Sequence, residues 1–253
     1  MIVSVAQAQL FFLALTRVLA VIIHVPVLAG QSVPTQVRIG LGILLSIILI
    51  PWQELPSAMQ SLTNFAFALA IAREILVGTL AGFASVLVFS TLQIAGELMG
   101  LGSGFAAGRI LNPALENTGS ALDQFFLTTT MLLFIVLNGH HSLILGLQRT
   151  FEVLPINSPL PQFTLDFLVR FTAQMLVVGV QLSLPVMGAL LLTDITLGLL
   201  ARVAPQVHVF FLGIPIKVGL GLAALALYFS ILFPYISRMF GSVGDYTVKL
   251  MGN

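Results

Sequence analysis

Three charged residues stand inside a strongly apolar stretch that runs from Leu191 to Leu222: Asp194, Arg202 and Lys217. A charge at the centre of a bilayer costs at least about 2.5 kcal/mol, so it persists only with an ionic partner or beside a polar cavity. Carboxylates in such surroundings carry protons in transporters, and Glu74 and Glu97 join Asp194 as candidates for that chemistry. We favour structural ion pairing as the role of these side chains.

The spacing of these charges does not pair them within one helix. Arg73 and Glu74 are neighbours and therefore face different directions. Asp194 and Arg202 differ by about 80° around a helix and are not partners on one helix face. Each charge is expected to meet its partner on another helix or another subunit. If the partner of Asp194 belongs to another subunit, charge reversal by Asp194→Lys should break assembly.

Residues for enzyme chemistry are sparse. His140 and His141 are adjacent, so on a helix they point about 100° apart and are poorly placed to bind one metal ion together. The chain has no cysteine, and it lacks the HExxH, GxSxG and phosphate-loop motifs. A membrane enzyme that used these histidines would also need clustered carboxylates, whereas the carboxylates here are scattered. We therefore expect no catalytic residues, no metal and no cofactor.

The composition is that of a membrane protein. Hydrophobic residues make up 58% of the 253 residues and charged residues only 8%, against about 25% charged residues in a soluble domain. The net charge of +1 and the absence of a basic run argue against nucleic acid as a partner. No basic residue precedes Arg17, so the first apolar segment is expected to be retained rather than cleaved as a signal peptide.

Apolar runs separated by proline- and glycine-rich breaks predict an all-α fold and a single domain. The runs are Leu10 to Leu28, Ile39 to Ile50, Phe65 to Ile94, Phe125 to Leu147, Phe171 to Leu192 and Val209 to Tyr235. The second run is too short to span a bilayer. Breaks are expected at 96–119, at 155–161 and at 205–215, among other places. Counting Lys and Arg on alternating sides gives a tie, so ordinary bilayer crossing by every helix is in doubt.

Glycine spacing indicates two different structures. Gly78 and Gly82 form a GxxxG pair, which is typical of a close helix–helix contact. Gly96, Gly100, Gly104 and Gly108 continue that spacing, but Gly102 and Asn112-Pro113 interrupt it. We expect GLGSGFAAGRILNP to form a flexible loop rather than a regular helix, and a mobile loop in an apolar chain favours a gating role.

Several blocks, in this order, resemble the FliR family of type III export-gate subunits and, more distantly, its injectisome counterpart. They are VPTQVRIGLGILLSIILIP, AREILVGTLAGFASVLVFSTLQIAGELMG, GFAAGRILNP, LLFIVLNGHH and LLTDITLGLLARVAPQVHVFFLGIPIKVGLGL. The last block contains Asp194, Gly198, Arg202, Pro205-Gln206, Gly213, Pro215 and Lys217. The resemblance extends over almost the whole chain.

This resemblance implies a non-enzymatic subunit of a protein export gate. Its partners would be FliP-type and FliQ-type subunits, an FlhB-type subunit, unfolded exported proteins in transit and the lipid membrane. The fold would be a membrane-associated bundle of long, bent helical hairpins, with a P-like portion at 1–155 followed by a Q-like hairpin at 156–253. The location would be the bacterial inner membrane, in the flagellar basal body, although the assembly would sit largely above the bilayer plane.

The resemblance also assigns a pore-closing plug loop at about Gly100 to Pro113. Its implied members are Gly100, Gly102, Gly104, Phe105, Gly108, Ile110, Leu111, Asn112 and Pro113. Phe105, Ile110 and Leu111 would seal the lumen, because a narrow apolar constriction dewets while a glycine-rich backbone can still yield to a passing chain. Arg73, Glu74, Glu97, Asp194, Arg202 and Lys217 would be intersubunit or buried charges. A secondary transporter that uses intramembrane charges is the alternative, but it should show matching interrupted helices in its two halves, and none are evident.

Overall fold

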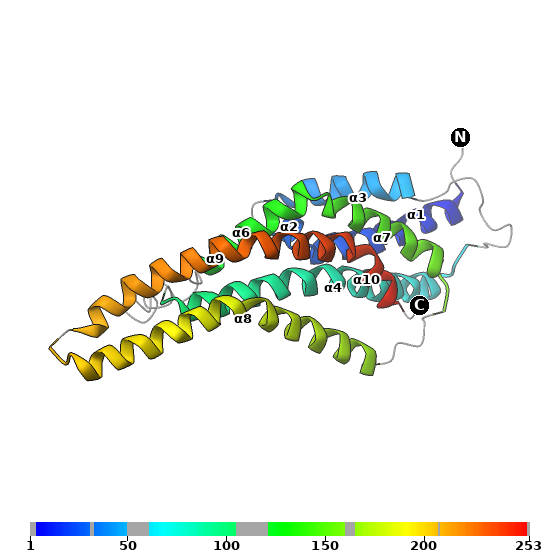
Figure 1. Cartoon of the computed structure of the whole chain (residues 1–253). Helices are drawn as coiled ribbons and strands as arrows, with labels where there is room; N and C mark the ends of the chain where they lie inside the picture. The colour runs from blue at the N-terminus through cyan, green and yellow to red at the C-terminus, as the bar shows by residue number, and fades with distance from the viewer. Residues whose placement is uncertain are drawn as a thin grey trace. The chain divides into compact units, whose positions relative to one another are not determined.

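The computed structural model describes residues 4–30, 33–49, 61–104, 121–159, 165–206 and 208–251, and the regular structure in these ranges is helical (Figure 1). The helices are α1 (Val5–His24), α2 (Pro26–Ala29), α3 (Thr35–Leu49), α4 (Asn64–Gly102), α6 (Ala121–Val136), α7 (Gly139–Val153), α8 (Leu165–Val203), α9 (Val209–Gly241) and α10 (Val243–Lys249). The prediction of an all-helical, membrane-type fold is confirmed.

Four helices are long and apolar enough to cross a membrane within the described ranges: α1, α4, α8 and α9. The helices α6 and α7 would count as a fifth span, although they are bent by 69° relative to each other. The bend falls at Leu137 and Asn138, where Asn138 adopts a left-handed conformation with φ of 56°. The predicted run from Phe125 to Leu147 is therefore a broken helix. The helix α3, with 15 residues, is the short apolar segment that the sequence predicts.

Two of the predicted breaks are wrong in position. The helix α4 continues through Gly96 and Gly100 and ends at Gly102, because its apolar neighbours pack and hold the backbone helical despite the glycines. Pro215 does not interrupt the chain but lies inside α9, as Pro234 does. Proline is tolerated in apolar helices, because neighbouring groups satisfy the carbonyls that it leaves unpaired.

The chain divides into two compact units, and each unit is assembled from separate stretches of sequence. The first comprises Met1–Leu87, Asn138–Arg170 and Phe240–Asn253, and the second comprises Val88–Leu137 and Phe171–Met239. The helices α4, α8 and α9 each contribute residues to both units. The spatial units thus interleave along the sequence.

In the first unit, α1 and α4 pack closely through glycine. The helix α1 begins with a capping box, in which the Ser4 and Gln7 side chains bond each other's backbone N–H. A Cβ added at Gly78 would lie 2.5 Å from the carbonyl oxygen of Arg17, and one at Gly82 would lie 2.7 Å from Cβ of His24. The predicted contact at this GxxxG pair is therefore confirmed, because only glycine permits such an approach.

The C-terminal helix α10 completes the first unit by packing on α7. A Cβ at Gly146 would lie 2.7 Å from Cα of Gly244, so the two backbones touch where these helices cross. The Thr247 hydroxyl donates to the carbonyl of Val243, at 2.9 Å, and is 3.4 Å from the carbonyl of Ala81 in α4. The C-terminal end of the described chain is thus anchored to α7 and α4.

In the second unit, α8 and α9 form an antiparallel hairpin (Figure 1). A Cβ at Gly213 would meet Leu197, and one at Gly221 would meet Leu190, so residue numbers run in opposite directions along the pair. The helix α4 runs parallel to α8, with Thr91 and Ile94 against Gly179 and Gly102 against Met187. Gly96 packs against Phe126 of α6.

Candidate functional site

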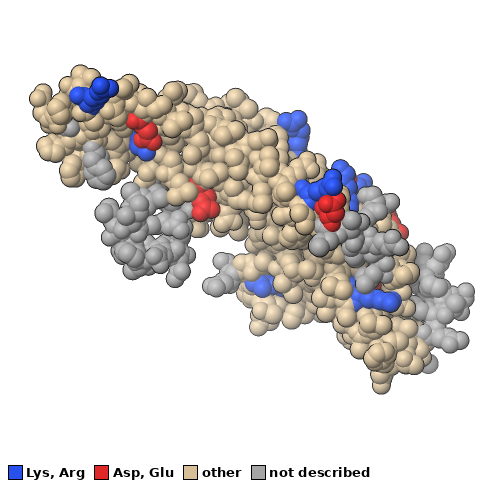
Figure 2. Space-filling view, turned by 90° about the horizontal axis from the view of Figure 1, so that it is seen from below, with Lys and Arg blue, Asp and Glu red and all other residues tan. Residues whose placement is uncertain are grey.

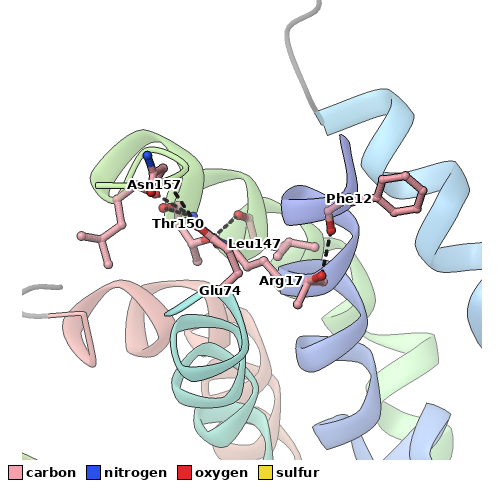
Figure 3. A network of polar contacts seen from close by, with 8 residues as sticks. Phe12, Arg17, Glu74, Leu147, Thr150 and Asn157 are labelled. Atoms are coloured by element: carbon pink, nitrogen blue, oxygen red, sulfur yellow. Dashed lines mark hydrogen bonds and ion pairs between the residues drawn. The ribbon is translucent and has the colours of Figure 1, made fainter. Parts of the chain in front are cut away.

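A buried ion pair joins α1 to α4 in the first unit (Figure 3). Nε of Arg17 donates to Oε2 of Glu74 at 2.5 Å, and the two side chains are only 1% and 3% exposed. Both helices are apolar around these positions, so each charge depends on the other for neutralisation. Glu74, a predicted buried charge, thus has a partner on another helix of the same chain.

Arg17 also caps the end of α7. Its Nη1 donates to the carbonyl oxygens of Thr150 at 3.0 Å and Leu154 at 2.7 Å, and its guanidinium lies 4.5 Å from the centre of the Phe151 ring. The last carbonyls of a helix lack partners within that helix and carry partial negative charge. A buried guanidinium is well suited to this position because it offers several donors in one plane.

The second carboxylate oxygen of Glu74 reaches the segment that follows α7. Oε1 accepts from the backbone N–H of Asn157 at 3.3 Å, and Asn157 is in the left-handed region with φ of 63°. Figure 3 shows Arg17, Glu74, Thr150 and Asn157 converging from three parts of the chain. The network therefore fixes the path of the chain where it leaves α7.

A second ion pair lies between α8 and α9. Nζ of Lys217 is 2.8 Å from Oδ1 of Asp194 and 3.0 Å from Oδ2, and the lysine and aspartate side chains are 22% and 51% exposed. The sequence excludes Asp194 and Arg202 as partners, and the structure pairs Asp194 with Lys217 instead. This pair fastens the hairpin near its turn.

Three of the predicted charges have no such partner. Arg73 is half-buried on α4, Glu97 is exposed on α4, and Arg202 is exposed near the end of α8. None of them makes a hydrogen bond or an ion pair with a residue that the structure describes. An intersubunit role for these residues stays a prediction.

Only the start of the predicted plug loop falls within the described residues. Gly100 is buried in the last turn of α4, and Gly102 ends that helix beside Met187. Gly104 follows with φ of 81°, a conformation that favours glycine. The other predicted members, Phe105, Gly108, Ile110, Leu111, Asn112 and Pro113, lie outside the described residues.

The two histidines form a pair of tilted rings at the start of α7, with centroids 5.2 Å apart. Nδ1 of His140 is buried and has no hydrogen-bond partner among the described residues. Across the described ranges, no three His, Asp or Glu side chains gather in a way that could hold a metal ion.

Sequence reasoning missed Arg17 as a site residue. It was noted only as the first basic residue of the chain, although a lone arginine within an apolar helix is itself a sign of a buried partner. Its partners at positions 74, 150 and 154 are too distant in sequence to be identified from local spacing.

Comparison with known proteins places the chain in a family. A family model described as "Bacterial export proteins, family 1" matches residues 8–243. The flagellar biosynthetic protein FliR of Escherichia coli K12 is 33% identical, over 93% of this chain and 90% of that protein. FliR of Bacillus subtilis 168 is 27% identical, over 96% and 93% of the two chains. The Yop proteins translocation protein T of Yersinia pestis is 28% identical, over 90% and 89%.

These matches extend over nearly the full length, and they agree with the order of sequence blocks and with the long apolar helices of the structure. The matches thus include flagellar biosynthetic proteins and a translocation protein. The chain therefore belongs to the bacterial export proteins of family 1, the FliR family, and is an export-apparatus protein rather than an enzyme.

Proposed function

We propose that this chain is a subunit of the flagellar type III export gate, in which it joins FliP-type and FliQ-type subunits to form the channel for unfolded flagellar proteins. Membership of the FliR family supports this assignment. An FlhB-type subunit is a further expected partner. The bacterial inner membrane, in the flagellar basal body, is the expected location.

The observation that carries the proposal is the incomplete burial of the α8–α9 hairpin. The most apolar windows of α8 and α9 are only 33% and 17% buried within the chain. Large side chains such as Leu192, Phe211 and Leu227 are exposed by 66%, 73% and 79%. Exposed apolar area of this extent indicates a surface that lipid or other subunits cover.

Charged residues on the same hairpin indicate that other protein subunits, rather than lipid alone, cover much of its exposed surface. Asp194 is half-exposed beside these apolar residues, and Arg202 is exposed without a described partner. Lipid would leave such groups poorly solvated, whereas neighbouring subunits can supply opposite charges or hydrogen bonds. On the face drawn in Figure 2 the charged side chains are few, some of them lie in small groups of both signs, and most of the surface around them is uncharged.

We further propose that residues 1–155 correspond to a P-like portion and 156–253 to a Q-like hairpin. The antiparallel packing of α8 on α9 supports the second assignment. A chain with both portions would occupy one P-type and one Q-type position and complete a ring built mainly from those subunits. The energy for export would come from partner proteins.

Plug residues from Gly100 to Pro113 would help to close the pore. The exit from α4 into this segment supports the assignment, because Gly102 ends the helix and Gly104 takes a conformation that redirects the backbone. Phe105, Ile110 and Leu111 would form the apolar seal.

Copurification tests the proposed assembly. The tagged chain would be produced with candidate P-type and Q-type proteins and analysed by native mass spectrometry. We expect one large complex of fixed composition. A chain that elutes alone or as a small homo-oligomer would contradict the gate proposal and favour a transporter.

Deletion within 105–113 tests the plug separately. We expect an assembled complex of unchanged composition that leaks ions across the membrane. A complex that assembles and does not leak ions would contradict the plug assignment and leave the subunit assignment intact. Replacing the same residues by a flexible glycine-serine linker of equal length controls for the shortening of the chain.

A further inference from the structure

The second half of α4 is enclosed on most of its circumference by other helices of the second unit. Phe89 packs against Phe134 of α6 with ring centroids 5.3 Å apart, and Gly96 meets Phe126 of the same helix. The Thr91 hydroxyl donates to the carbonyl of Met175 in α8 at 3.2 Å. Ser103, which follows the end of α4, meets Gly221 of α9. Thus α6, α8 and α9 all contact this part of the chain.

A single stripe of this half-helix stays open. Between Val88 and Gly102 the residues that are exposed or partly exposed lie at spacings of three and four, which places them on one helix face. They are Ser90, Gln93, Ile94, Glu97, Leu98, Leu101 and Gly102. We call this face the α4 stripe. It includes a hydroxyl, an amide and a carboxylate along a line of about 10 Å, given a rise of 1.5 Å per residue.

The α4 stripe differs from the outer face of α9 in the same unit. The exposed residues of α9 between Leu220 and Phe233 carry no charge. They are Leu220, Leu222, Ala223, Ala226, Leu227, Ser230, Ile231 and Phe233. The outer face of α9 is thus suited to lipid or to an apolar neighbour, whereas the α4 stripe is not.

The polar groups of the α4 stripe are also left unsatisfied by the described chain. Neither Gln93 nor Glu97 makes a hydrogen bond or an ion pair with a described residue. Contact with lipid would leave the Glu97 carboxylate without solvation. A dry contact with another subunit would require a cation and an amide partner at matching positions. Water satisfies a serine, a glutamine and a glutamate together with no such match.

From this juxtaposition we propose that the α4 stripe borders the water-filled path of the export channel, so that Gln93 and Glu97 face the hydrated polypeptide in transit. The proposal rests on the proposed function and adds to it the face of this chain that contacts cargo. A carboxylate beside the path favours cationic over anionic groups in its neighbourhood.

Thiol labelling tests the proposal, and the chain is convenient for it because it contains no natural cysteine. Single cysteines would be placed by Gln93→Cys and Glu97→Cys in the α4 stripe, by Leu220→Cys and Leu227→Cys on α9, and by Met99→Cys in the buried face of α4. The assembled complex would be treated with a charged, membrane-impermeant methanethiosulfonate. We expect the cysteines at 93 and 97 to react at least about tenfold faster than those on α9, because the thiolate forms and reacts only in water.

The sign of the reagent provides a second readout. In Gln93→Cys, Glu97 lies one helical turn away, so its charge should raise the ratio of the rate with a trimethylammonium reagent to the rate with a sulfonate reagent. Because a cationic reagent reacts faster with any thiolate, this ratio is compared with that of the same cysteine combined with Glu97→Gln, in which it should be about threefold lower. Equal ratios in the two variants, or rates at 93 and 97 as slow as at 220 and 227, would overturn the proposal.

Charge reversal at Glu97 distinguishes two possible neighbours of this carboxylate, namely water and a cation of a partner subunit. If the α4 stripe faces water, Glu97→Lys leaves the composition of the complex unchanged in native mass spectrometry. Loss of a subunit from the complex would instead show that Glu97 pairs across an interface, and the proposal would be wrong. A wild-type chain that assembles with neither P-type nor Q-type protein would contradict the proposed function itself. Slow labelling in an assembled complex would contradict only the proposal on the α4 stripe.

Discussion

Arg17 and Glu74 meet as a buried ion pair although 57 positions separate them in the chain. The guanidinium also bonds two carbonyls at the end of α7, and the carboxylate also accepts from the backbone of Asn157. One pair of side chains therefore holds together α1, α4 and the exit from α7. Because each charge is the ionic partner of the other among the described residues, the pair is sensitive to the loss of either member.

Removing the carboxylate by Glu74→Ala should destabilise the chain by about 3–5 kcal/mol, since it leaves a buried guanidinium unpaired. The change in unfolding free energy would be measured on the purified chain in detergent. Asp245→Ala is the matched control, because the side chains of Asp245 and its partner Arg149 are 61% and 54% exposed. Asp245→Ala should lower the free energy of unfolding by less than about 1 kcal/mol. The double change Arg17→Met with Glu74→Leu should cost less than Glu74→Ala alone, and equal losses in all three variants would contradict a special role for the buried pair.

Adding one methyl group at Gly78 should loosen the packing of α1 on α4. The new Cβ would lie 2.5 Å from a backbone oxygen, which cannot rotate away, so Gly78→Ala should destabilise by about 1–3 kcal/mol. Gly188→Ala in α8 is the control, because its Cβ would meet nothing within 4 Å. It should be neutral or stabilise by up to about 1 kcal/mol through helix propensity. Thermal unfolding of the two variants checks the difference, and a stable Gly78→Ala chain would show that the helices do not approach this closely.

Exchanging the charges of Asp194 and Lys217 tests whether their pairing lies within the chain. Asp194→Lys alone should lower the yield of assembled complex, because it places two cations together between α8 and α9. Adding Lys217→Asp should restore most of the complex, since the exchanged pair can form again. If the main partner of Asp194 belongs to another subunit, the double variant would stay as defective as the single one. The fraction of chain in the complex, measured by native mass spectrometry, decides between these outcomes.

The left-handed backbone of Asn157 should tolerate glycine better than a β-branched residue. An L residue costs about 1–2 kcal/mol in this conformation, so Asn157→Val should destabilise by at least that amount. Asn157→Gly keeps the backbone N–H that donates to Glu74 and should be nearly neutral. Hydrogen exchange of residues 150–159 measures the local effect. Equal protection in the two variants would show that this backbone conformation does not hold the segment in place.

The amino-acid sequence by itself determined the class of this protein and most of its helices. The extent of a helix is governed largely by apolar runs and prolines that are local in the sequence. The start of α9 at Val209 and the short helix α3 were therefore predictable. The close contact at Gly78 and Gly82 was predictable for the same reason, since both glycines lie on one face of one helix. The order of the sequence blocks was enough to indicate the FliR family, which the comparisons show.

The local sequence pattern predicted the wrong helix boundary where tertiary packing outweighs helix propensity. Gly96 and Gly100 lower helix propensity, yet Phe126 lies against Gly96 and the helix continues to Gly102. The partners of the charges were likewise beyond local reasoning. The joining of Arg17 to Glu74, and of Asp194 to Lys217, depends on how distant helices pack and in which register. Only the tertiary structure decides such contacts, because the energy of a buried charge is set by whatever the fold brings within a few ångströms of it.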